Sequence, residues 1–205
     1  MGMNIARLSS LKRYNNMPRI KQESLAEHMY YTAIIGRRIM DYMKMSPEEK
    51  MDTLSYILCH DVAELYTGDI PHNVKQDHPD FKIFIEKIED QFLLASSMKN
   101  LAEGFINNPS ESKILVFKLA DILQVLMYAE DEIQYGNSHI EFLEIVNNAQ
   151  RISTDLVNKI HDKGYSENLI DYQVLLNEIR QVLPDSYRFN PVDGVPKEEG
   201  HRYED

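Results

Sequence analysis

The chain has 205 residues, of which 43% are hydrophobic and 27% charged, and its formal net charge is −11. This composition favours one soluble globular domain, and no apolar run approaches the ~20 residues that a membrane-spanning helix needs. The acidic balance argues against nucleic acid as a partner, because binding to the phosphate backbone depends on clustered Lys and Arg. A small phosphorylated ligand needs only local positive charge. The single cysteine, Cys59, excludes an internal disulfide and favours a reducing, cytoplasmic compartment.

Helix signals recur along the chain, whereas strand signals are nearly absent. A short amphipathic piece near the start carries Ile5, Leu8 and Leu11. Ser24 and Glu27 then form a capping-box pattern, in which the side chain of each residue accepts a hydrogen bond from the backbone N–H of the other. This pattern predicts a helix that runs to about residue 43.

The Ser46-Pro47 pair is a second strong helix start, because a capping residue precedes a proline at the first helical position. We expect this helix to continue through its apolar positions to Leu65 and to end near Gly68 and Pro71. Apolar residues recur at helical spacing in four later segments. These segments span residues 80–106, 110–135, 139–161 and 166–182.

Six or seven helices joined by short connectors predict an all-α fold, organised as a single-domain helical bundle. The bundle is expected to occupy residues 1–183. From residue 184 onward prolines, glycines and charged residues replace the periodic pattern. Residues 184–205 are therefore expected to form an extended C-terminal tail.

Metal-binding residue types interrupt three of the predicted apolar helices. His28 lies in the first turn of one helix. His60 and Asp61 are adjacent in a second, and Asp121 interrupts a third. Each has an ordinary structural explanation when taken singly, since histidine has varied roles and a lone helical Asp usually pairs with a Lys such as Lys118. Together, two imidazoles and two carboxylates suit a borderline divalent cation such as Mn²⁺, Co²⁺, Ni²⁺ or Zn²⁺, with Mg²⁺ less favoured.

Two further acids follow the His-Asp pair. Glu64 lies four residues after His60 and three after Asp61, so a continuous helix would place all three on one face. From there Glu64 could reach a metal-bound water. Asp69 follows in a turn after Gly68, a position where active-site carboxylates often lie. Taken alone, Glu64 could equally be a solvated acid at a helix end.

The order His, His-Asp and a distant Asp resembles the HD-domain metal-dependent phosphohydrolases, and more closely the YfbR-like 5′-deoxynucleotidases. The similarity rests on "KRYNNMPR", "ESLAEH", "CHDVAELYTGDIPHNVK" and "KLADILQVLMYAEDE". It implies the HD-domain fold, a homodimer, and release of phosphate from nucleoside 5′-monophosphates, chiefly 2′-deoxynucleotides. It also implies one divalent metal ion per chain, bound by His28, His60, Asp61 and Asp121.

The resemblance also implies roles for individual residues near the metal. Glu64 would be the catalytic carboxylate, and Asp69 a second catalytic or substrate-contacting acid. Arg13 would hold the phosphate and Tyr14 would flank the substrate. Tyr14 stands where the family has Trp, and His72 where it usually has a small hydroxyl residue, so sugar and base preference stay open. The remaining implied substrate contacts are Ile70, Pro71, His72 and Lys75.

Three alternatives remain open at this point. Related HD enzymes use the same ligand set to remove tri- or pyrophosphate from nucleoside triphosphates. An HD oxygenase with two irons would need additional histidines between the His-Asp pair and the last Asp. His72 and His78 lie there, but in a predicted proline-flanked loop rather than on helices. A non-catalytic helical module could bind a structural ion or a partner, although such a module would have no use for Glu64, Asp69 or Arg13.

Overall fold

The structure, a computed structural model, describes residues 4–96, 98–169 and 171–182. Regular elements within these residues are helical, and their only extended pairing is an isolated bridge between Lys12 and Ser24. The predicted all-α class is confirmed, while the predicted tail at 184–205 lies outside the described residues. No described helix is long and apolar enough to cross a bilayer. In chain order the helices are η1 (Ile5–Ser9), α1 (Leu25–Tyr42), α2 (Pro47–Ile57), α3 (Glu64–Thr67), α4 (His72–Asp77), α5 (Pro79–Ala95), α6 (Lys99–Ile106), α7 (Glu111–Gln134), α8 (Ile140–Asp162) and α9 (Tyr172–Val182).

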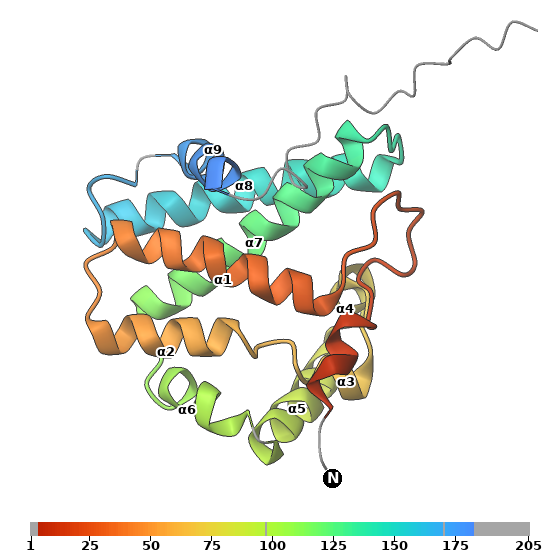
Figure 1. The fold of residues 1–205 in the computed structure, drawn as a ribbon, viewed down its shortest axis with the longest axis horizontal. Helices are drawn as coiled ribbons and strands as arrows, with labels where there is room; N and C mark the ends of the chain where they lie inside the picture. The colour runs from red at the N-terminus through yellow and green to blue at the C-terminus, as the bar shows by residue number, and fades with distance from the viewer. Residues whose placement is uncertain (1–3, 97, 170, 183–205) are drawn as a thin grey trace, which may run out of the picture.

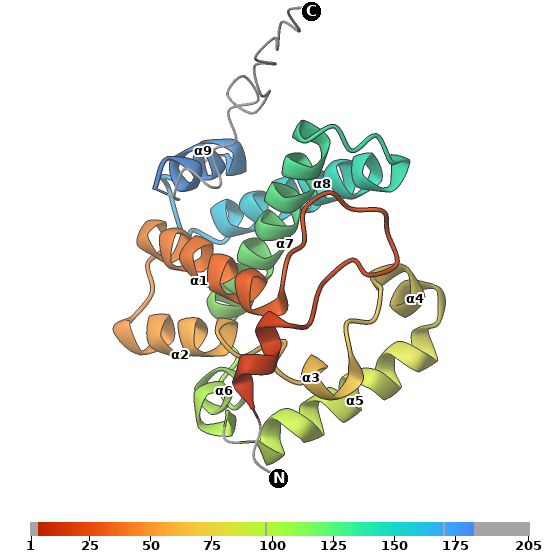
Figure 2. The ribbon, with the colours of Figure 1, turned by 45° about the vertical axis from the view of Figure 1, so that its right-hand side comes forward.

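The long helix α7 is the centre of the bundle (Figure 1). It packs along α1 and α8, and α2 packs against both α1 and α7. α9 contacts α1 and α8, and α6 contacts α2. α5 lies past the end of α2, with the short helices α3 and α4 beside it (Figure 2). The site described below is formed where α1, α7 and the segment after α2 meet.

The main hydrophobic core lies between α1, α2, α7, α8 and α9. Ile35 and Ile39 of α1 and Leu119 and Leu123 of α7 are fully buried in it. Burial of one such side chain contributes about 1.5–3 kcal/mol. Gly36 allows α2 to approach α1 closely, because a Cβ at this position would lie only 2.6 Å from Ile57 Cδ1.

The predicted helix starts at Ser24 and Ser46 are confirmed. Both serines complete capping boxes, with Glu27 and Glu49 as the respective reciprocal partners. Ser110 caps α7 by accepting a hydrogen bond from the backbone N–H of Lys113. These starts depend on interactions within four residues, which is why sequence pattern alone places them correctly.

One predicted helix ends early. The apolar pattern predicts a helix to Leu65, but α2 ends at Ile57 and turns connect it to α3, which starts at Glu64. In the connection, Cys59 N–H donates to the carbonyl three residues earlier, and Val62 N–H does the same. This i→i−3 winding is tighter than an α-helix, so residues 58–63 do not continue the helical face of α2.

The early end of α2 has a side-chain cause. The Nδ1 of His60 lies 2.8 Å from the carbonyl oxygen of Ile57, which an uninterrupted α-helix would use for a backbone bond. His60 and Asp61 are therefore carried by turns rather than by a helix. The prediction that Glu64 shares a helical face with them is wrong, although the turns bring all three toward the same site.

Other boundaries also differ from the predicted segments. The segment 80–106 divides at Ser96, whose Oγ accepts a hydrogen bond from Met98 N–H and donates one to Leu93 O. α9 starts later than predicted, because Ser166 Oγ binds the N–H groups of Asn168 and Leu169 in a turn. The predicted proline-flanked loop is in part a helix, α4. Hydroxyl-to-backbone bonds of this kind compete with helix continuation.

Candidate functional site

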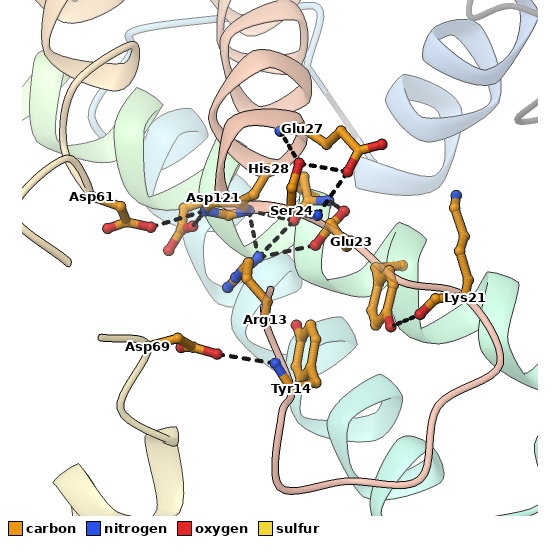
Figure 3. A network of polar contacts seen from close by, with 12 residues as sticks. Arg13, Tyr14, Lys21, Glu23, Ser24, Glu27, His28, Asp61, Asp69 and Asp121 are labelled. Atoms are coloured by element: carbon orange, nitrogen blue, oxygen red, sulfur yellow. Dashed lines mark hydrogen bonds and ion pairs between the residues drawn. The ribbon is translucent and has the colours of Figure 1, made fainter. Parts of the chain in front are cut away.

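The structure brings His28, His60, Asp61 and Asp121 together (Figure 3 labels all but His60). The Nε2 of His28 lies 3.2 Å from Asp121 Oδ1 and 3.4 Å from Asp61 Oδ2. The Nε2 of His60 lies 3.2 Å from the same oxygen of Asp61. Ligand atoms of His28, His60 and Asp121 all lie within 4.8 Å of one another. Asp121 faces this cluster and not Lys118, whose side chain is exposed.

The cluster contains buried polar atoms that the protein leaves unsatisfied. The Nε2 atoms of His28 and His60 are both buried and have no hydrogen-bond partner within residues 4–96, 98–169 and 171–182. Buried nitrogens in folded proteins are normally paired, so two converging imidazole lone pairs need a positive partner. Asp61 and Asp121 supply carboxylates beside them, and their side chains are 23% and 40% exposed. These residues therefore fit a divalent cation with nitrogen and oxygen ligands and one side open to solvent.

The electrostatics of the cluster favour the same conclusion. Burial alone would lower the pKa of His60, but the carboxylates of Asp61 and Asp121 raise it to about 9. Burial alone would raise the pKa of Asp61, but His60, His28 and Arg13 hold it well below its usual range. The pKa of Asp121 is also lowered, against the effect of its burial, mainly by His28. The carboxylates stay ionised, and a bound cation would replace the imidazole proton.

Glu64 lies beside this cluster at the start of α3. Its side chain is 12% exposed, and its buried Oε2 has no hydrogen-bond partner in the part of the chain that the structure describes. Burial, helped by the charges of Asp61 and Asp69, raises the pKa of Glu64 to about 9. Lys75 Nζ, from α4, lies 3.9 Å from Glu64 Oε1 and 3.9 Å from Glu89 Oε1. Glu64 is thus a carboxyl group that holds its proton at neutral pH in the metal-free protein.

Arg13 approaches the cluster from the segment before α1 (Figure 3). Its Nη1 donates to Glu23 Oε2 at 3.3 Å and to Gln124 Oε1 at 3.1 Å, and it contacts His28 Nδ1. The backbone N–H of Arg13 also donates to Glu23 O at 3.0 Å. These contacts fix a permanently charged guanidinium next to the imidazole of His28.

Tyr14 and Asp69 join two loops at the edge of the site. The backbone N–H of Tyr14 donates to Asp69 Oδ2 at 3.0 Å. Tyr14 has φ 57°, which is rare for an aromatic residue, and its ring stacks on Tyr128 with 4.7 Å between the ring centroids. Gly68, with φ 79°, makes the turn that presents Asp69. One oxygen of Asp69 is therefore committed to positioning the Arg13–Tyr14 backbone.

The remaining predicted residues lie along the chain that follows Asp69. Ile70 and Pro71 are half-buried and lead into α4. His72 is the first residue of that helix, and its side chain is not among those described. Lys75, further along α4, contacts the site through its ion pair with Glu64. Residues 70–75 therefore lie beside the cluster of His28, His60, Asp61 and Asp121, on the side of Glu64.

Sequence reasoning missed two buried residues of the site, Glu23 and Gln124. Gln124 Nε2 donates to Glu23 Oε1 at 2.5 Å, and Gln124 Oε1 lies 2.6 Å from His28 Nδ1. A local signal existed for Gln124, because it follows Asp121 by three positions and so lies on the same face of α7. Glu23 gives no such signal, since it precedes the N-cap Ser24 as an ordinary acid.

Sequence comparison finds 5′-deoxynucleotidases among the relatives of this chain. A sequence profile of the family described as 5′-deoxynucleotidase YfbR-like matches residues 3–162. The chain is 27% identical over 146 residues to a 5′-deoxynucleotidase of Photorhabdus temperata, covering 65% of this chain and 74% of that protein. It is 25% identical over 192 residues to a 5′-deoxynucleotidase of Enterobacter sp. strain 638, covering 88% and 95%.

Solved structures of HD phosphohydrolases share this fold. One is the cyanophage S-2L HD phosphohydrolase DatZ, which is bound to dA and one catalytic Zn²⁺ ion. It has a TM-score of 0.62 and 17% identity, and the match covers 92% of this chain and 99% of that one. Another is an HD-domain phosphohydrolase of Listeria innocua, with a TM-score of 0.59, 18% identity, and coverage of 92% and 88%. These matches confirm the predicted HD-domain fold.

Proposed function

Because the chain belongs to the YfbR-like 5′-deoxynucleotidase family, we propose that it releases phosphate from nucleoside 5′-monophosphates, with 2′-deoxynucleotides as its preferred substrates. The observation that carries this proposal is the convergence of two unpaired imidazole nitrogens and two carboxylates next to a fixed guanidinium. A structural metal site would not need the guanidinium or a protonated carboxyl group beside it. The proposed ligands of one divalent cation are His28, His60, Asp61 and Asp121.

The donor set limits which cation fits. Two imidazoles and two carboxylates favour Mn²⁺, Co²⁺, Ni²⁺ or Zn²⁺, whereas Mg²⁺ prefers an all-oxygen shell that retains several waters. The Zn²⁺ in the cyanophage protein, which shares this fold, is consistent with that range. When bound, such a cation lowers the pKa of a water ligand and screens the charge of the phosphoryl oxygens.

Two cationic side chains beside the proposed ligands are the proposed phosphate contacts. Arg13 presents a planar guanidinium, which can pair with two phosphoryl oxygens at once. Its anchors, Glu23 and Gln124, hold one end of the side chain and so set the direction of its free N–H groups. Lys75, held between Glu64 and Glu89, is a second contact for the phosphate or for the adjacent carboxyl group.

Glu64 is the residue we assign to proton transfer. A departing 5′-oxygen needs a proton as its bond to phosphorus breaks. Glu64 is a largely buried carboxyl group beside the proposed ligands, and before the cation binds it keeps its proton at neutral pH. The unpaired Oε2 of Glu64 leaves that group available to a substrate. Asp69 contributes by holding the Tyr14 backbone, and therefore Arg13, in place.

The test is phosphate release from a panel of ribo- and deoxynucleotides, from mono- to triphosphates. The protein is treated with chelator and then reloaded with Mn²⁺, Co²⁺, Zn²⁺ or Mg²⁺. We expect orthophosphate and nucleoside from deoxynucleoside monophosphates, and no turnover before metal is restored. Release of pyrophosphate or tripolyphosphate would instead identify a triphosphate hydrolase, and no turnover with any metal would contradict the proposal.

Two further proposals concern the assembly and the location of the protein. The homodimer comes from family resemblance, and light scattering of the purified protein would test it. Cytoplasmic location is inferred from the single cysteine, Cys59, which is free and buried. Fractionation of expressing cells would test the location.

A further inference from the structure

Glu23, Gln124 and His28 form a buried chain of hydrogen bonds behind the proposed metal ligands. Glu23 and Gln124 are 1% and 2% exposed, and His28 is fully buried. Glu23 and Gln124 lie 101 positions apart in the sequence, so only the fold brings them together. The chain ends at His28 Nδ1, the ring nitrogen on the side away from Asp61 and Asp121.

Hydrogen-bond chemistry fixes the orientation of the Gln124 amide. Arg13 can only donate, so the atom of Gln124 that lies 3.1 Å from Arg13 Nη1 must be the oxygen. The amide NH₂ then faces Glu23 Oε1, where it donates at 2.5 Å. Two independent neighbours therefore select the same orientation.

This orientation determines where His28 carries its proton. The oxygen of Gln124 lies 2.6 Å from His28 Nδ1, and an amide oxygen can only accept. Arg13 Nη1 also lies 2.5 Å from Nδ1, but its two hydrogens are accounted for by Glu23 Oε2 and Gln124 Oε1. Nδ1 therefore bears the hydrogen that Gln124 accepts, which leaves the lone pair of a neutral imidazole on Nε2. That atom is the buried, unpaired nitrogen that faces Asp61 and Asp121.

The same two residues also anchor Arg13. Glu23 Oε2 and Gln124 Oε1 both accept from Arg13 Nη1, and the backbone of Arg13 is hydrogen-bonded to that of Glu23. An isolated bridge between Lys12 and Ser24 continues this pairing. One buried carboxylate–amide pair thus contacts both the proposed phosphate-binding residue and a proposed metal ligand.

We propose that Glu23 and Gln124 are positioning residues, which preset His28 as an Nε2 metal ligand and hold Arg13 beside it. This inference rests on the proposed function for its catalytic meaning, but its claim about His28 does not depend on turnover. Partners of this kind raise ligand basicity and fix ring orientation, and their loss typically weakens metal binding by about 10–100-fold.

The first test uses the unmodified, metal-free protein. Nitrogen-15 NMR at alkaline pH distinguishes a protonated Nδ1 from a protonated Nε2 in each neutral histidine. We expect His28 to be protonated at Nδ1 before any metal is added. A His28 protonated at Nε2 would overturn the inference whether or not the protein hydrolyses nucleotides.

The second test measures Co²⁺ affinity by competition with a chelator. Gln124→Met keeps the buried volume but removes the acceptor, and should weaken binding about 10–100-fold. Leu126→Met, an equally buried change on the same helix, is the matched control and should stay within about twofold of the parent protein. Affinity of Gln124→Met equal to that of the control would refute a positioning role.

A paired exchange provides a rescue that also covers failure of the single variant to fold. In Glu23→Gln/Gln124→Glu, the amide at position 23 can donate to the carboxylate at position 124, whose other oxygen accepts from His28. We expect Co²⁺ affinity within about threefold of the parent and His28 again protonated at Nδ1. Affinity about 10–100-fold below the parent would contradict the proposal.

Discussion

Replacement of Glu64 by Gln should make the metal-free protein more stable while it removes activity. Glu64 is nearly isosteric with Gln, and its Oε2 has no hydrogen-bond partner to lose. Its carboxyl group is largely buried, and the pKa is raised from 4.5 to about 9 by burial and by the charges of Asp61 and Asp69. The folded protein therefore keeps a proton on Glu64 that the unfolded chain releases.

The sign and size of the effect follow from this difference. A carboxyl group with a raised folded-state pKa contributes stability that is fully present below pH 4.5 and is lost as the pH rises toward 9. Each pH unit in that window costs about 1.4 kcal/mol. At pH 7 the loss is about 3 kcal/mol, and a neutral Gln does not incur it. The variant should therefore gain about 3 kcal/mol at pH 7 and about nothing at pH 4.5.

Urea unfolding of the metal-free parent and variant at pH 4.5 and pH 7 measures this gain. Glu144→Gln, an exposed change on α8, is the control and should alter stability by less than about 0.5 kcal/mol at both pH values. In the metal-loaded enzyme, Glu64→Gln should lower kcat by about 10²–10⁴-fold, because the proton donor is lost. Equal stability of parent and variant at pH 7 would refute the assignment of a protonated Glu64.

Three further changes test other parts of the structure. Arg13→Lys keeps the charge but loses the planar fork, so kcat/KM should fall about 100-fold with metal content unchanged; an unaltered kcat/KM would exclude Arg13 from phosphate binding. Lys113→Met leaves Asp52 without its 2.7 Å partner in the α2–α7 contact. The free energy of unfolding, measured in urea, should fall by about 3–5 kcal/mol. A fall below about 1 kcal/mol would show that the pair is not stabilising. Hydrogen bonds from the backbone of Ser46 and from nearby serine hydroxyls lower the pKa of Glu49 from 4.5 to about 2. The ionised Glu49 therefore stabilises the fold above pH 4.5, and this contribution is lost as the pH falls from 4.5 to 2. Glu49→Gln should remove that acid-side loss, and an acid unfolding curve identical to that of the parent would contradict this.

Sequence pattern predicts those helix boundaries that depend on local interactions. Ser24 and Ser46 mark α1 and α2 because each cap is completed within four residues. The end of α2 is different, since apolar residues continue at helical spacing beyond Ile57. The helix stops there because the side chain of His60 takes the carbonyl of Ile57, and periodicity carries no information on that bond.

Some residues of the site can be predicted from the sequence, and others cannot. His28, His60, Asp61 and Asp121 were recognisable because ionisable side chains interrupt apolar segments. Their approach within 3.2–3.4 Å is a tertiary result that a sequence pattern can only suggest. Buried partners such as Gln124 have ordinary residue types, and their role emerges only from contacts between distant segments.

Equilibrium titration of the metal-free protein with Co²⁺, run in parallel on Asp121→Asn, tests the central claim most directly. Visible absorption of the bound ion reports both the number of ions per chain and their affinity. Binding of one ion per chain, weakened at least about 100-fold in the variant, is the predicted result. Two ions per chain, or equal affinity in parent and variant, would contradict a single site built from His28, His60, Asp61 and Asp121.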